Sequence, residues 1–205
     1  MRPLTILAAA LMALPVAAGA ADSAVTLYGG YRGGGSFSDV GSGRPIDVKQ
    51  SASAAASVDF AIDASRQLQF FVAHQKSKFE TGAAPAAPAS GLNGQSVSVT
   101  YFHLGGTNFF DGPIGRGPYV VGGLGATLFS PGTNGFSSEW RPSMNVGLGY
   151  QWPLGGRLAL RAEARWYVTL VNSQGGLFCS GGCVIRVSGD TFTQGDAQLG
   201  LSLEL

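Results

Sequence analysis

The stretch RLALRAEARWYVTL, residues 157–170, places charged side chains at every second or fourth position of an otherwise apolar segment. Alternation with a period of two is typical of a β-strand. It assigns one face to Leu158, Leu160, Ala162, Ala164, Trp166 and Val168, and the other to Arg157, Ala159, Arg161, Glu163, Arg165, Tyr167 and Thr169. Because only 12% of the chain is charged, charge gathered on one face of one strand needs an explanation.

Residues 1–20 have the pattern of an export signal. Arg2 supplies the positive charge, Leu4 to Val16 form an apolar run, and Ala18-Gly19-Ala20 fits a small-x-small cleavage site. The run is too short for a membrane-spanning helix, which needs about 20 apolar residues. We therefore expect cleavage, with residues 21–205 forming one mature domain.

Composition separates this chain from ordinary soluble proteins. Its charged share of 12% is about half of the roughly 25% that is usual for soluble domains. A net charge of +1 provides no basic stripe for nucleic-acid phosphates, which argues against a nucleic-acid partner. No other apolar run in the chain has the length of a membrane-spanning helix either.

Eight alternating segments follow the signal, at residues 24–32, 53–63, 66–75, 96–110, 118–129, 141–152, 157–170 and 196–205. In the fourth segment we expect Val97, Val99 and Tyr101 to face outward. Phe102 and Leu104 then break the phase, which predicts a β-bulge near His103.

Short and long connections alternate between these segments. The longer ones, at about 33–50, 76–95, 130–140 and 171–190, are rich in Gly, Ser, Pro and Asn. Transmembrane barrels have this arrangement, with short periplasmic turns and longer outer loops. The sequence therefore predicts an all-β fold, an eight-stranded antiparallel transmembrane β-barrel with four longer outer loops.

A soluble eight-stranded barrel is the alternative, but it would need charge on its outer face. Here the face opposite the apolar row carries mostly Gly, Ser, Thr, Asn and Gln, which suit a narrow lumen. Aromatic residues near strand ends or along the apolar face are expected to form girdles: Tyr28, Tyr31, Tyr101, Tyr150, Trp152 and Trp166.

The charges of the opening stretch then face the lumen, where each needs a partner. Counting along the strands pairs Arg165 with Asp196 and Arg157 with Glu204, while Asp59 can reach Arg161 across the narrow interior. We expect a network of Asp59, Arg161, Glu163, Arg165 and Asp196 that fills the lumen. The alternative is that the same groups line a conducting path or a gate.

Several segments, YFHLGGTNFF, RGPYVVGGLGATLFSP, LALRAEARWYVTLVNS and LFCSGGC, resemble a family of exported porin-like barrels without an assigned role. The whole mature chain is similar to the small OmpA-like, OmpX-like and OmpW-like outer-membrane barrels of Gram-negative bacteria. The resemblance implies a location in the outer membrane and insertion by the barrel-assembly machinery. Such barrels usually end in an aromatic residue, whereas Leu205 is last here, which predicts weaker recognition by that machinery.

Two cysteines, Cys179 and Cys183, lie close together in FCSGGCV. Export to an oxidising compartment favours a disulfide between them. A metal site is the alternative, but two thiols without a nearby histidine leave a tetrahedral site half empty. The loop that they close, with Leu177 and Phe178, is a candidate contact surface, although the disulfide could equally serve only to order the loop.

A lipid-modifying enzyme is the rival functional class, because a hydrolase needs a nucleophile, a histidine and a carboxylate together. His74, Ser77 and Glu80 lie near the outward end of the third segment, but their spacing does not match the deacylase pattern. Lys76 and Lys78 in the same place are candidate contacts for lipopolysaccharide phosphates.

We therefore expect a monomeric, non-enzymatic outer-membrane barrel without cofactors, in contact with membrane lipid and lipopolysaccharide, and with a structural or surface-interaction role. A narrow channel for small or hydrophobic solutes is the first alternative, and a lipid A-modifying enzyme is the second.

Overall fold

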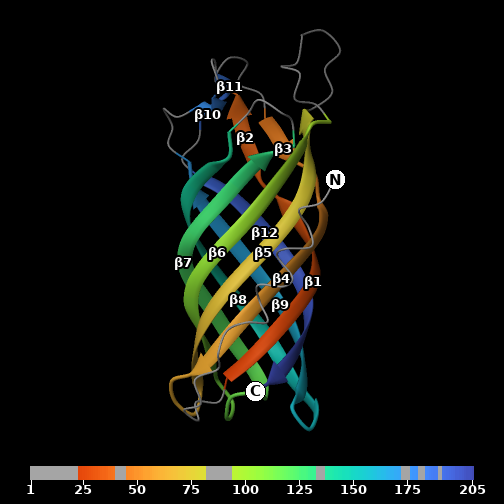
Figure 1. The fold of residues 1–205 in the computed structure, drawn as a ribbon, viewed down its shortest axis with the longest axis vertical. Coiled ribbons are helices and arrows are strands. Elements are labelled where there is room, and N and C mark those ends of the chain that lie inside the picture. Colours follow the sequence, from red (N-terminus) through yellow and green to blue (C-terminus); the bar gives the residue numbers. More distant parts are fainter. Residues whose placement is uncertain are drawn as a thin grey trace.

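The computed structural model describes residues 23–39, 45–81, 94–132, 137–171, 176–179, 183–188 and 191–205. Eight long antiparallel strands form a closed barrel (Figure 1). They are β1 (Ser23–Gly34), β4 (Ser51–Ala61), β5 (Arg66–Thr81), β6 (Ser96–Phe109), β7 (Gly117–Pro131), β8 (Glu139–Gly155), β9 (Leu158–Leu170) and β12 (Thr191–Glu204). The predicted fold class is confirmed. The predicted signal peptide lies outside the described residues and stays a prediction.

The barrel closes where the first long strand meets the last. β1 pairs with β12 from Ala24 opposite Glu204 to Gly34 opposite Gln194, and β1 pairs with β4 along its other edge. Closure matters in a membrane because hydrocarbon offers no hydrogen bonds to an open strand edge. No helix among the described residues is long and apolar enough to cross a membrane.

Short turns connect the strands at the lower end of the barrel in Figure 1, where the C-terminus also lies. In transmembrane barrels this end faces the periplasm. The upper end carries four short strands that the sequence did not predict: β2 (Ser36–Asp39), β3 (Pro45–Val48), β10 (Gly176–Cys179) and β11 (Cys183–Ser188). They arise because β5 continues to Thr81, beyond its predicted end at Gln75, so that its extension can pair with β3.

The outer surface of the barrel is apolar, as expected for strands that face lipid. Leu27, Leu124, Val146 and Leu199 are each more than 60% exposed. The alternating polar positions turn inward and are buried, including Thr26, Ser57, Gln69, Asn145 and Gln198. A soluble barrel would have the opposite arrangement.

The predicted face of β6 is wrong. Val97, Val99 and Tyr101 are buried in the lumen, and the alternation continues without a break through His103 and Phe109. The pairing of β6 with β5 runs from Ser96 to Asn108 without a register shift, so the predicted bulge is absent. The error arose because the upper lumen is apolar, so that an apolar row there marks the inside.

Two predicted girdle residues also lie inside. Tyr28 is 5% exposed and Tyr101 is fully buried. Tyr31, Tyr150, Trp152 and Trp166 do face outward, as does Trp140 on β8, which was not predicted.

Candidate functional site

Arg161 forms the first of three buried ion pairs in the lumen. Its Nη1 lies 3.2 Å from Asp59 Oδ2, across the barrel from β9 to β4, and both side chains are at most 1% exposed. Its Nε donates to Gln151 at 2.8 Å. Tyr28 approaches closely enough to accept from Arg161 Nη1, and its ring occupies the space that a side chain at Gly200 would fill.

Arg165 pairs with Glu163 two residues before it on β9, with 2.7 Å between Nε and Oε1. Glu163 also accepts hydrogen bonds from Gln198 Nε2 and the Tyr119 hydroxyl. Gln69 links this pair to the first one, because it accepts from Arg165 Nη2 and donates to Asp59. The two ion pairs therefore belong to one hydrogen-bonded network.

The predicted pairing of Arg165 with Asp196 is wrong, although the two residues are opposite each other on β9 and β12. Asp196 pairs instead with Arg32 on β1, which donates from Nε at 3.0 Å and from Nη2 at 2.7 Å. Ser53 donates a further hydrogen bond to Asp196. Arg32 alternates on β1 with the exposed Tyr31, so the period of two would have allowed its inclusion in the predicted network.

Arg32 also lies close to two tyrosine rings. Its guanidinium carbon is 5.0 Å from the centroid of Tyr101 and 4.7 Å from that of Tyr167. The rings of Tyr101 and Tyr167 stack at 4.2 Å. His103 stacks against both rings and shares a hydrogen bond of 2.9 Å with Ser143, which places it in the lumen.

Above this layer most buried side chains are apolar, although Thr127 and Thr169 share a hydrogen bond at the level of Phe192. A buried cluster fills the upper end, where the rings of Phe129 and Phe192 meet edge to face at 5.3 Å. Its other members in this layer are Ile46, Val48, Phe79, Val97, Val99 and Val171. Within the described strands, the lumen thus holds paired charges in the middle and a largely apolar cluster above.

The lower end contains a cavity of about 350 Å³ lined by residues that include Gln67, Gln151 and Arg161. Arg157 and Glu204 lie at this cavity, but among the described residues their predicted ion pair does not form. They are joined through the backbone, where Glu204 N donates to Arg157 O at 2.9 Å.

The residues considered for hydrolysis do not converge. His74 faces outward and shares a hydrogen bond with Thr100 Oγ1, whereas Ser77 faces inward and donates to the carbonyl of Lys49. Glu80 is held by Lys49 at 2.9 Å. Within the described part of the chain, this triad is therefore not assembled.

Cys179 and Cys183 are opposite each other in the pairing of β10 with β11. Their side chains, and those of Leu177 and Phe178, lie outside the described residues. The disulfide and the contact surface therefore remain predictions.

No protein-family model and no curated protein sequence matches the chain. Solved structures that share its fold include the following two. The crystal structure of Neisserial surface protein A (NspA) has a TM-score of 0.55 at 14% identity, and the similarity covers 89% of this chain and 97% of that chain. The solid-state NMR structure of outer membrane protein AlkL in DMPC lipid bilayers has a TM-score of 0.57 at 17% identity, with 94% and 95% covered. The fold is that of the small outer-membrane barrels, which supports the predicted location in the outer membrane.

Proposed function

We propose that this chain is a closed, non-conducting outer-membrane barrel with a structural or surface-interaction role. The observation that carries this proposal is the filled lumen. Arg32, Arg161 and Arg165 are at most 1% exposed, and each is paired with an acid. We call these three ion pairs and their hydrogen-bond partners the lumenal plug.

The energetics of the pairs support a plug more than a pore. A solute that passes must separate the contacts that cross the lumen, Arg161 with Asp59 and Arg165 with Gln69, and so leave the buried charges of Arg161 and Asp59 without partners. Removing one partner of a buried pair typically costs about 3–5 kcal/mol. The charges also cancel pair by pair, so the lumen offers no net charge that would select an ion.

A specific role then belongs to the upper end, where the short strands β2, β3, β10 and β11 extend beyond the barrel (Figure 1). The segment of β10 and β11, with Leu177, Phe178 and a disulfide between Cys179 and Cys183, is our choice for the contact surface. The observation that supports it is the backbone pairing that sets the two cysteines opposite each other.

Single-channel conductance of the refolded mature protein in a planar bilayer tests the plug. We expect the parent to be silent and the double variant Asp59→Ala, Arg165→Ala to conduct, because it removes one member from each of the two linked pairs. The control is Lys49→Ala, Glu80→Ala, which removes the same charges from an exposed pair outside the lumen. This control should be silent.

Steady conductance in the parent would contradict the plug. The same charges would then line a path, and a narrow channel for small solutes would become the better description. A silent double variant that is folded would show that the apolar upper cluster closes the barrel by itself.

A further inference from the structure

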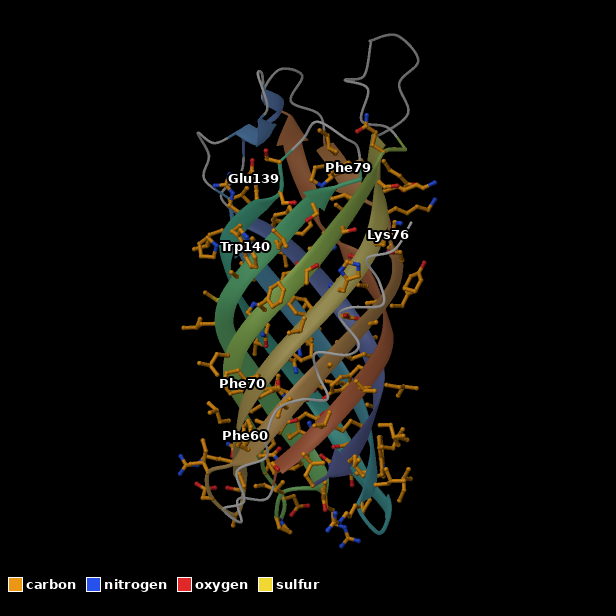
Figure 2. The ribbon with its side chains drawn as sticks, viewed as in Figure 1. Phe60, Phe70, Lys76, Phe79, Glu139 and Trp140 are labelled. Atoms are coloured by element: carbon orange, nitrogen blue, oxygen red, sulfur yellow. The ribbon has the colours of Figure 1, made fainter. Side chains whose placement is uncertain are left out.

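The outward face of β5 changes character near its upper end. Leu68, Phe70 and Val72 face lipid and are 36–49% exposed. The next outward positions are His74, Lys76, Lys78 and Glu80. Figure 2 shows Lys76 high on the barrel, with Phe70 and Phe60 far below it. Cations therefore begin where the apolar band ends on this strand.

Lys76 and Lys78 have no ion-pair partner among the described residues. The nearby acids lie above them: Glu80 is bound by Lys49, and Asp47 is opposite Glu80 in the pairing of β3 with β5. Residues 82–93, which follow β5, contain no Asp or Glu. Within the described strands, Lys76 and Lys78 are thus two unpaired cations at the upper end of the apolar band, and the nearby acids Glu80 and Asp47 lie further from that band.

Hydroxyl groups lie beside these lysines on the next strand. In the pairing of β5 with β6, Lys76 is opposite Ser98 and Lys78 is opposite Ser96. Residues two apart on a strand face the same way, with Cα atoms about 7 Å apart. On the other side, β4 presents the small, exposed Ala54 opposite His74, then Ala52, and the backbone of Lys49 meets that of Lys78. Lys76 and Lys78 are themselves exposed, so they are open to a ligand that approaches from the membrane.

We propose that Lys76 and Lys78 bind the phosphate groups of a phosphorylated lipid of the outer leaflet, with Ser96 and Ser98 as hydrogen-bond donors. A phosphate on a lipid fits because it lies at the upper boundary of the hydrocarbon, where these cations begin. Its acyl chains would lie along the apolar face of β5 around Phe70. The chemistry matches the phosphates of lipopolysaccharide, and it does not depend on whether the lumen conducts.

The test measures lipid A bound to the refolded mature protein by native mass spectrometry after extraction in neutral detergent. Lipid A supplies phosphates and acyl chains together. The variant Lys76→Ala, Lys78→Ala should bind lipid A about 30-fold more weakly than the parent, since each lysine near a membrane surface contributes a several-fold gain for anionic lipid. Lys76→Arg, Lys78→Arg should restore binding because it restores both charges.

The matched control is Arg116→Ala, Arg157→Ala, which removes two exposed cations from the lower turns and should bind lipid A like the parent. Dephosphorylated lipid A should bind the parent as weakly as phosphorylated lipid A binds the lysine variant. Equal binding of lipid A by the parent and a folded lysine variant would overturn the proposal. Complete displacement of lipid A by millimolar inorganic phosphate would also overturn it, because the site would then recognise a free anion.

Discussion

The middle and the top of the lumen are occupied by opposite kinds of side chains. In the middle, Arg161 and Asp59 are held by directional hydrogen bonds from strands on several sides of the barrel. At the top, Phe129 and Phe192 pack with aliphatic side chains and need no particular orientation of charge. Both regions are buried equally well, so the difference lies in what happens when one side chain is lost.

The comparison shows that burial alone does not predict the cost of a substitution. A charged group that loses its partner keeps its full desolvation penalty. An apolar cluster that loses part of a side chain loses contacts in proportion to the volume removed. The middle of the lumen should therefore be sensitive to single changes, whereas the top should tolerate them.

The largest effect is expected for Asp59→Leu, which leaves Arg161 buried without its counter-ion. We expect the free energy of unfolding to fall by about 3–5 kcal/mol, measured by urea titration of the protein refolded in lipid vesicles. Asp59→Asn should lose less, because its amide oxygen can still accept the hydrogen bond from Gln69. A loss under about 1 kcal/mol for Asp59→Leu would mean that the ion pair does not stabilise the barrel.

Leucine is also the replacement at the top of the lumen. We expect Phe192→Leu to lower the free energy of unfolding by about 1 kcal/mol in the same titration. The apolar cluster keeps an apolar side chain there and can repack around it. Should Phe192→Leu cost as much as Asp59→Leu, the proposed contrast between the two regions would fail.

The smallest effect is expected outside the barrel, in the turn between β4 and β5. Hydrogen bonds from Arg66 and the backbone of Ser65 lower the pKa of Asp63 to about 2. The ionised form is therefore favoured by folding, and its contribution is present above the ordinary pKa of 3.8 and is lost as the pH falls through about 2.

The urea midpoints of the parent and of Asp63→Asn should thus differ slightly at pH 7 and converge as the pH falls from 4 toward 2. A constant difference across this range would show that the charge of Asp63 does not matter to the turn. Because this carboxylate is exposed, solvent screening keeps its effect below that of Asp59.

The number of long strands and their approximate positions could be predicted from alternation, because a membrane barrel repeats one simple pattern. The face of β6 that lies inside the barrel could not be predicted from alternation, because Val97 and Val99 are as apolar as a pair that faces lipid. Only the barrel as a whole determines which apolar row lies inside. The contact between Arg161 and Asp59 could be predicted, because the interior of a small barrel is narrow enough for side chains on distant strands to meet.

The ion pair of Asp196 was missed for a different reason. Register placed Arg165 and Arg32 on either side of Asp196, so two cations competed for one acid. The short strands above the barrel depend on pairing with the extension of β5. The residues of 36–39 and 45–48 have no local pattern that predicts this pairing.

The pairing of β1 with β12 has a consequence for assembly. Until β12 arrives, the partly folded sheet has two unpaired edges, one on β1 and one on β9. Such edges recruit other strands, so the incomplete chain is prone to aggregate. Asp196 also arrives only with β12, so Arg32 has no counter-ion on its neighbouring strand before that step. The final strand therefore completes two things at once, the hydrogen bonding of both sheet edges and the ion pair of Arg32.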